Sequence, residues 1–92
     1  MREDINSICD EINNSVFDLI NVIANASNLW KLEELQNRVY ESLQDGNGTI
    51  SDRQKEKCLK AVNNILAEAR FYLSEDEIRK YADDIYSQMN RL

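Results

Sequence analysis

The strongest structural signal in the chain is the stretch Ser51–Tyr72, which has the sequence SDRQKEKCLKAVNNILAEARFY. It opens with Ser-Asp-Arg-Gln, a capping box in which Ser and Gln side chains satisfy free backbone N–H groups at a helix start. Apolar residues then recur every three or four positions, the spacing of an amphipathic helix. These expected core positions are Cys58, Ala61, Val62, Ile65, Ala69 and Tyr72. The stretch therefore predicts a helix with one buried face.

The same apolar spacing occurs three more times in the chain. A second capping box, Ser74–Glu77, opens the last predicted helix. Two further helices are predicted upstream, over about residues 4–25 and about residues 29–43. Their expected core positions are Ile5, Ile8, Cys9, Ile12, Val16, Leu19, Ile20 and Ile23, then Leu32, Leu35, Val39 and Leu43. Those of the last helix are Ile78, Tyr81, Ala82, Ile85, Met89 and Leu92.

Short polar segments separate the predicted helices. Asn25–Asn28 is rich in capping residue types, and Asp45–Gly48 holds both glycines of a chain that has no proline. A length of 92 residues fits one domain with one modest core. We therefore expect an all-α protein, with a single helical-bundle domain over residues 1–92 of about four mostly antiparallel helices. The join at Ser74 is so short that it could form either a sharp corner or a hairpin.

The composition excludes most catalytic chemistry. Without His the chain cannot form a Ser-His or Cys-His nucleophile pair, and its two Cys cannot form a four-thiolate metal site. The carboxylates fall on polar helix faces or at helix starts, whereas catalytic pairs need burial to separate their pKa values. We therefore expect no enzymatic activity, no catalytic residues, no metal and no cofactor.

The charge balance and the hydropathy pattern limit the partners. Seventeen acids against eleven bases give a net charge of −6, whereas nucleic-acid binding needs dense Lys and Arg. No run of 18 apolar residues could span a membrane, and the first residues lack a signal-peptide pattern. We expect a cytoplasmic protein without direct contact to nucleic acid or membrane. Cys9 and Cys58 lie on apolar stripes and are expected to be reduced and buried.

The segment Asp45–Ser51, DGNGTIS, resembles the middle of an EF-hand calcium loop. The resemblance would place ligands at Asp45, Asn47 and Ser51 and the turn glycine at Gly48. The ends of the loop depart from the family, because Leu43 has no side-chain oxygen and Gln54 stands where a bidentate Glu is expected. One interpretation is therefore a degenerate calcium module, and the other is a glycine turn that ends one helix before Ser51 caps the next.

The first predicted helix has an unbalanced charge. Residues 1–28 hold five acids and one base, Arg2, whereas solvated helices usually interleave Glu and Lys four residues apart. The acidic strip, with Asp10, Glu11 and Asp18 at its centre, could steer a partner that has a basic surface. Alternatively it is a solvated face, partly balanced across the bundle by the basic residues of the third helix.

Two large aromatic residues are out of phase with the stripes of their helices. By the helical-wheel angle of about 100° per residue, Trp30 and Phe71 point away from the predicted core. Exposed aromatic side chains are enriched among interface anchors. The alternative is local packing, with Trp30 folded onto the end of the first helix and Phe71 covering the corner at Ser74.

Together these features favour a non-enzymatic interaction module that binds and occludes a surface on a protein partner. The predicted contact residues are Asp10, Glu11, Asp18, Trp30 and Phe71. Inhibitors, immunity or antitoxin proteins and phage-encoded regulators share this size and charge, which is an analogy and not an assignment. The alternatives are a self-associating structural or adaptor protein, active as a homo-oligomer, and the degenerate calcium module.

Overall fold

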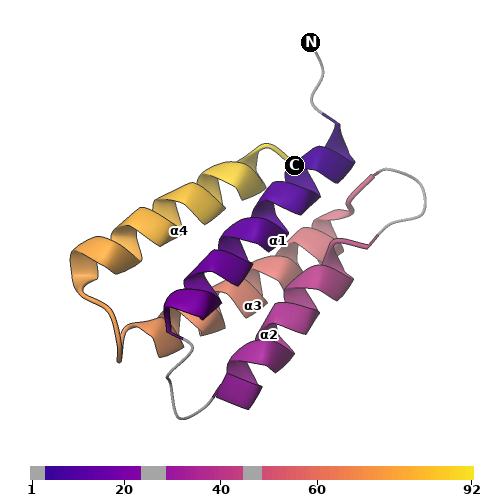
Figure 1. Ribbon diagram of the computed structural model, residues 1–92. Helices are drawn as coiled ribbons and strands as arrows, with labels where there is room; N and C mark the ends of the chain where they lie inside the picture. Colours follow the sequence, from indigo (N-terminus) through magenta and orange to yellow (C-terminus); the bar gives the residue numbers. More distant parts are fainter. Residues whose placement is uncertain (1–3, 24–28, 45–48) are drawn as a thin grey trace.

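The structure is a computed structural model that describes residues 4–23, 29–44 and 49–92. These residues form four helices, α1 (Ile5–Val22), α2 (Leu29–Ser42), α3 (Asp52–Ala69) and α4 (Glu75–Asn90), and no strand. Successive helices run in opposite directions, and the most extensive contacts are between α2 and α3 and between α1 and α4 (Figure 1). The predicted all-α, mostly antiparallel bundle is confirmed.

Hydrogen bonds from side chains to the backbone fix three of the helix starts. At α3, the Ser51 Oγ accepts from the Gln54 N–H at 3.2 Å, and the Gln54 Oε1 accepts from the Ser51 N–H at 2.9 Å. Ser74 and Glu77 form the same reciprocal pair at α4. A carboxylate oxygen of Asp4 accepts from the backbone N–H of the second residue after it, at the start of α1. Both predicted capping boxes are therefore confirmed.

The helix ends depart from the predicted bounds. The first helix was predicted to end at about residue 25, and α1 ends at Val22. Residues 24 and 25 lie outside the described residues. The third helix was predicted to bury Tyr72, but α3 ends at Ala69. The N–H groups of Phe71 and Tyr72 donate to carbonyls only three residues earlier, so tight turns replace the helix. Tyr72 thereby leaves the stripe and is exposed, which makes its predicted burial wrong.

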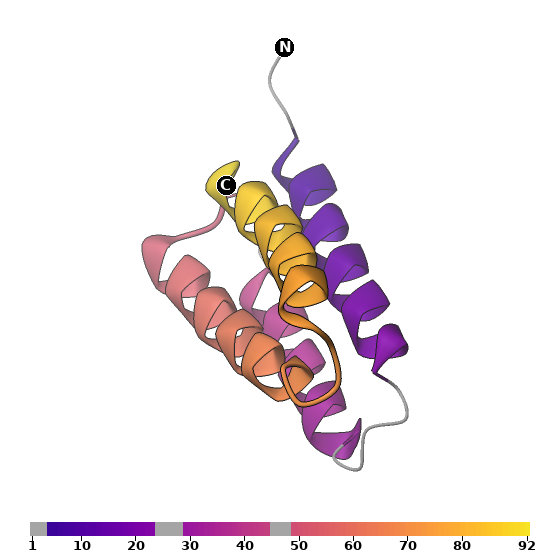
Figure 2. The same ribbon diagram turned by 90° about the vertical axis from the view of Figure 1, so that its left-hand side faces the viewer.

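The connection between α3 and α4 is a hairpin. After the turns at residues 70–74, α4 runs back antiparallel to α3 and α1 (Figure 2). In this arrangement α4 packs closely against α1 and contacts α3 much less. The Tyr86 hydroxyl donates to the Asn63 side-chain oxygen and joins the two helices. The α3–α4 seam is therefore the more open of the two that α4 forms.

The core is built from the predicted stripes. All the core positions predicted in α1 and α2 are buried, except for Ile5, which is half-buried. In α3 the stripe is confirmed apart from Tyr72, and Leu66 joins it. In α4 only Ile78 and Ile85 are buried, while Tyr81, Ala82, Met89 and Leu92 are half-buried. Each fully buried aliphatic side chain contributes about 1.5–3 kcal/mol by leaving water.

The side chain of Gln54 clamps the end of α2 to the start of α3. Its Nε2 donates to the backbone carbonyls of Ser42, at 3.2 Å, and Gln44, at 3.0 Å, while its Oε1 accepts from Ser51. The amide is therefore engaged by the backbone on both its oxygen and its nitrogen. The glycine loop with Asp45, Asn47 and Gly48 lies outside the described residues, so the prediction about calcium stays a prediction.

Candidate interaction surface

All five predicted contact residues are exposed. The side chains of Asp10, Glu11 and Asp18 lie on the outer face of α1. Trp30 is 68% exposed and Phe71 is 80% exposed. The alternative expectation for the two aromatic residues, that local packing covers them, is therefore wrong.

The topology brings the exposed aromatic residues to one end of the bundle. Because the helices alternate in direction, α1 and α3 end where α2 and α4 begin (Figure 1). An ion pair of 2.8 Å between the Lys31 Nζ and the Glu68 Oε1 joins the first turn of α2 to the last turn of α3. Trp30 and Phe71, which flank this ion pair in sequence, therefore share one end of the molecule.

Two further apolar side chains lie exposed at this end. Val22 is the last residue of α1 and is 49% exposed, and Tyr72 in the α3–α4 connection is 44% exposed. We refer to Val22, Trp30, Phe71 and Tyr72 as the apolar end. The helical wheel places Tyr72 in the core, so sequence reasoning missed it as a surface residue. No Gly or Pro marks the end of α3, so the sequence carries no local signal that would have identified Tyr72 as exposed.

The acidic strip on α1 is only partly compensated. Within the part of the chain that the structure describes, neither Asp10 nor Asp18 forms an ion pair. Glu11 does, because its Oε2 lies 2.6 Å from the Nη1 of Arg91, just after α4. The alternative interpretation expected the compensating base to come from the third helix. The base that pairs with Glu11 comes instead from the end of α4. Both side chains stay partly exposed, so this pair contributes at most about 1 kcal/mol.

The predicted contact residues do not form one compact cluster. With a rise of about 1.5 Å per residue, Asp18 lies about 6 Å along the helix axis from Val22, and Asp10 lies about 18 Å from it. Asp18 thus adjoins the apolar end, whereas Asp10 and Glu11 lie nearer the other end of α1. A standard interface of about 800 Å² per partner is about 30 Å across. Along the axis of α1, an interface of this width is long enough to reach from Asp10 to the apolar end.

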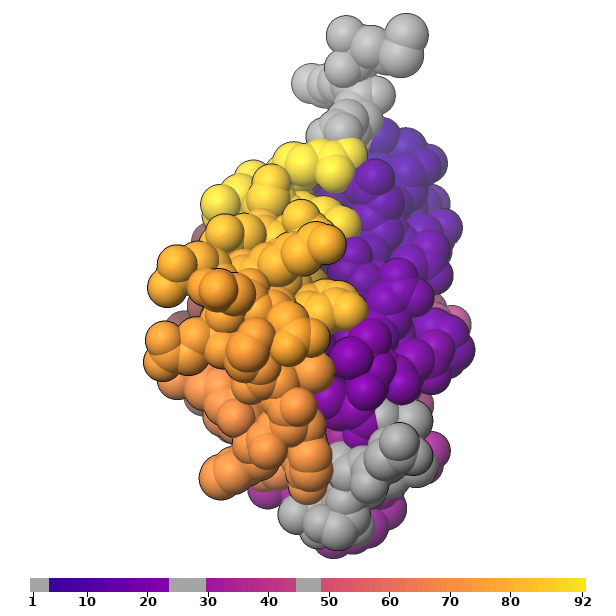
Figure 3. Space-filling model, turned by 60° about the vertical axis from the view of Figure 1, so that its left-hand side comes forward, coloured from indigo at the N-terminus to yellow at the C-terminus, as the bar shows by residue number. Residues whose placement is uncertain are grey.

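A second acidic helix adjoins α1. In Figure 3, α1 and α4 lie side by side and together form one face of the molecule. α4 carries five acids and two bases, and α1 carries three acids and no base. The two helices together therefore give this side of the bundle an excess of negative charge.

The thiol of Cys58, whose pKa is raised, lies in the interior and not on this surface. Burial raises the pKa of the Cys58 thiol to about 11, against the opposing effect of a hydrogen bond with the Ser42 side chain. A thiol with that pKa stays protonated at neutral pH and is a poor nucleophile.

In residues 4–23, 29–44 and 49–92, no three His, Cys, Asp or Glu side chains group as metal ligands would. In the same residues, no helix combines the length and apolar character that crossing a membrane requires.

Comparison with known proteins provides no family for this chain. No protein-family model, no curated protein and no solved structure matches it. The function is therefore argued from the surface and its chemistry.

Proposed function

We propose that the chain is a non-enzymatic interaction module that binds and occludes a basic surface on a protein partner. The observation that carries this proposal is the apolar end, where four large apolar side chains are 44–80% exposed beside an acidic helix. Exposed aromatic side chains gathered at one end of a small bundle suit an interaction surface, because Trp and Tyr are enriched among the residues that anchor interfaces. Occlusion of a partner's surface is a function that inhibitors and immunity or antitoxin proteins share.

The two parts of the surface support different steps of binding. The uncompensated carboxylates of Asp10 and Asp18 would accelerate encounter with a basic partner and orient it, an effect that salt screens. The side chains of Trp30 and Phe71 would bury apolar area in the complex and slow its dissociation. Aromatic anchors of this kind cost at least about 2 kcal/mol of binding energy when truncated.

The electrostatic part is tested with a partner identified by capture from the native lysate and mass spectrometry. The triple variant Asp10→Asn, Glu11→Gln and Asp18→Asn should associate more slowly and with a weaker salt dependence in biolayer interferometry. A matched control, Glu33→Gln, Glu41→Gln and Glu56→Gln, removes the same charge from exposed positions on α2 and α3. If both triple variants associate alike, net charge and not the α1 strip steers the encounter.

The anchoring part is tested with single truncations. Trp30→Ala or Phe71→Ala should raise the dissociation rate about tenfold or more, because a loss of about 2 kcal/mol exceeds one factor of ten. Tyr40→Ala is the control, since Tyr40 is exposed near the end of α2, away from the apolar end. Unfolding free energies should be nearly unchanged in all three variants. If all three dissociate at the wild-type rate, the apolar end does not anchor the partner.

Self-association is a second candidate, and the same apolar end favours it. Two copies that meet at this end would bury each other's exposed aromatic residues without any basic partner. Light scattering after size exclusion separates the two proposals, because a dimer would have twice the chain mass of 10.7 kDa. A dimer that Phe71→Ala converts to monomer would support self-association over the hetero-partner.

A further inference from the structure

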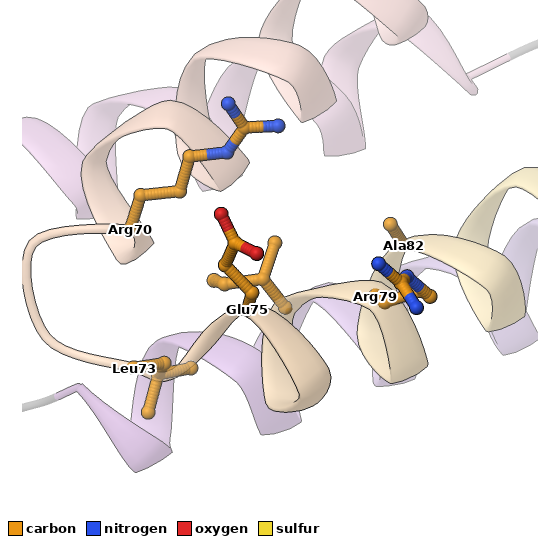
Figure 4. A pocket seen from close by; sticks show the side chains of 6 residues that line it. Arg70, Leu73, Glu75, Arg79 and Ala82 are labelled. Carbon is orange, nitrogen blue, oxygen red and sulfur yellow. The ribbon is translucent and has the colours of Figure 1, made fainter.

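A hollow of about 430 Å³ lies beside the α3–α4 connection (Figure 4). It is lined by Arg70, Leu73, Glu75, Ile78, Arg79 and Ala82. Its volume falls at the small end of the range of about 300–1,000 Å³ that ligand-binding clefts occupy. A ligand that fills it is therefore no larger than one or two amino-acid residues.

The lining combines apolar and charged side chains. Leu73, Ile78 and Ala82 supply the apolar part, and Ile78 also belongs to the core. Figure 4 shows the side chains of Arg70 and Glu75 extending toward one another across the hollow, with Arg79 one turn further along α4. The hollow can thus contact both an apolar side chain and an ionised group of the same ligand.

The charges in the hollow do not balance. The lining holds two guanidinium groups, of Arg70 and Arg79, and one carboxylate, of Glu75, which leaves one positive charge in excess within a chain of net charge −6. Among the residues that the structure describes, neither Arg70 nor Arg79 forms an ion pair or a side-chain hydrogen bond. Each guanidinium has five N–H donors in a fork that matches a carboxylate. The chemistry that complements this hollow is therefore a carboxylate beside an apolar group.

We infer that the hollow binds the C-terminal residue of a partner polypeptide. Its aliphatic side chain would rest on Leu73, Ile78 and Ala82, and its α-carboxylate would accept hydrogen bonds from Arg70 and Arg79. A C-terminal residue carries the anion and the apolar group on one carbon, which suits a hollow of this size, whereas an internal acid needs a second residue for the apolar contact. This inference goes beyond the proposed function, because it assigns an anion-binding site to a chain whose proposed partner surface is basic.

The experiment uses the full chain and three short peptides, followed by ¹⁵N–¹H NMR titration. The first peptide is acetyl-Gly-Ser-Gly-Leu with a free carboxylate, the second is its C-terminal amide, and the third is acetyl-Gly-Glu-Leu-Gly amide. The free acid should bind about tenfold or more tightly than either amide, because hydrogen bonds to a charged group are lost in the second and misplaced in the third. The largest shift changes should fall on Leu73, Ile78 and Ala82.

Substitutions in the hollow should move affinity in opposite directions. Arg70→Gln and Arg79→Gln should each weaken binding of the free acid, whereas Glu75→Gln should tighten it by removing a repelling carboxylate. Arg53→Gln, which removes an exposed guanidinium from the first turn of α3, should leave affinity unchanged. The inference is overturned if the free acid does not bind below about 10 mM, if an amide binds equally well, or if Arg70→Gln and Arg79→Gln bind like the wild type. The tightening by Glu75→Gln cannot come from misfolding, so it keeps the test decisive.

Discussion

The buried thiol of Cys58 predicts a loss of stability in alkaline solution. Cys58 is fully buried, and burial raises its pKa from an ordinary value of 9.0 to about 11. The folded chain therefore keeps this proton at a pH where the unfolded chain has already lost it. The resulting stabilisation is fully present below pH 9 and is lost as the pH rises from about 9 to about 11.

The size of the loss follows from the shift. A difference of one pKa unit corresponds to about 1.4 kcal/mol, so the whole shift is worth up to about 3 kcal/mol, and about 2 kcal/mol of this is lost by about pH 10.5. Urea unfolding followed by circular dichroism should be compared at pH 8 and pH 10.5 for the wild type and for Cys58→Ala. All other groups are common to the two proteins, so the difference between them reports on the Cys58 thiol together with its coupling to Cys9.

The expected result is that the unfolding free energy of Cys58→Ala rises relative to that of the wild type at high pH. The wild type should lose about 2 kcal/mol more unfolding free energy than Cys58→Ala between the two pH values. The reasoning fails if the difference between the two proteins is the same at pH 8 and pH 10.5. In that case the Cys58 thiol is not excluded from water as its position in the core requires.

Three further predictions concern stability and calcium. Ser51→Ala and Ser74→Ala should each lower the free energy of unfolding by about 0.5–2 kcal/mol in urea titrations, whereas Ser87→Ala, at an exposed position inside α4, should not lower it. Ile65→Ala should cost about 2–5 kcal/mol, and Leu59→Ala on the same helix should cost well under half of that, because Leu59 is partly exposed. Isothermal titration calorimetry should detect no calcium binding tighter than about 1 mM; a tighter site would favour the calcium module.

The sequence predicted the helix starts better than the helix ends, for a physical reason. A start such as Ser51 is fixed by side chains within four residues of it, and that information is local. The end of α3 carries no Gly or Pro, so the residue at which the helix ends depends on how residues 70–74 turn toward α4. Tyr72 was misplaced for this reason. Leu66 follows Val62 by four positions, so the periodicity itself could have identified it as a core residue.

The candidate surface was predictable residue by residue but not as an assembly. The helical wheel was sufficient to predict that Trp30 and Phe71 are exposed. Their presence at one end of the bundle depends on the order and direction of all four helices. The pair between Glu11 and Arg91 joins residues 80 positions apart, which no local pattern reveals. The hollow at the α3–α4 connection was missed for the same reason, since Arg70 and Arg79 lie on opposite sides of a turn.

The clamp at Gln54 has a consequence for how this connection could evolve. A single change to Glu would supply the acid with which EF-hand loops end. The same change would replace an amide nitrogen that donates to the carbonyls of Ser42 and Gln44 with an oxygen that can only accept. The partly buried Ser42 carbonyl would be left without its donor at a cost of about 1–3 kcal/mol, whereas water can replace the donor at the exposed Gln44 carbonyl. The shortest mutational path toward a calcium ligand here therefore first weakens the joint between α2 and α3, and a lineage could follow it only with stability to spare.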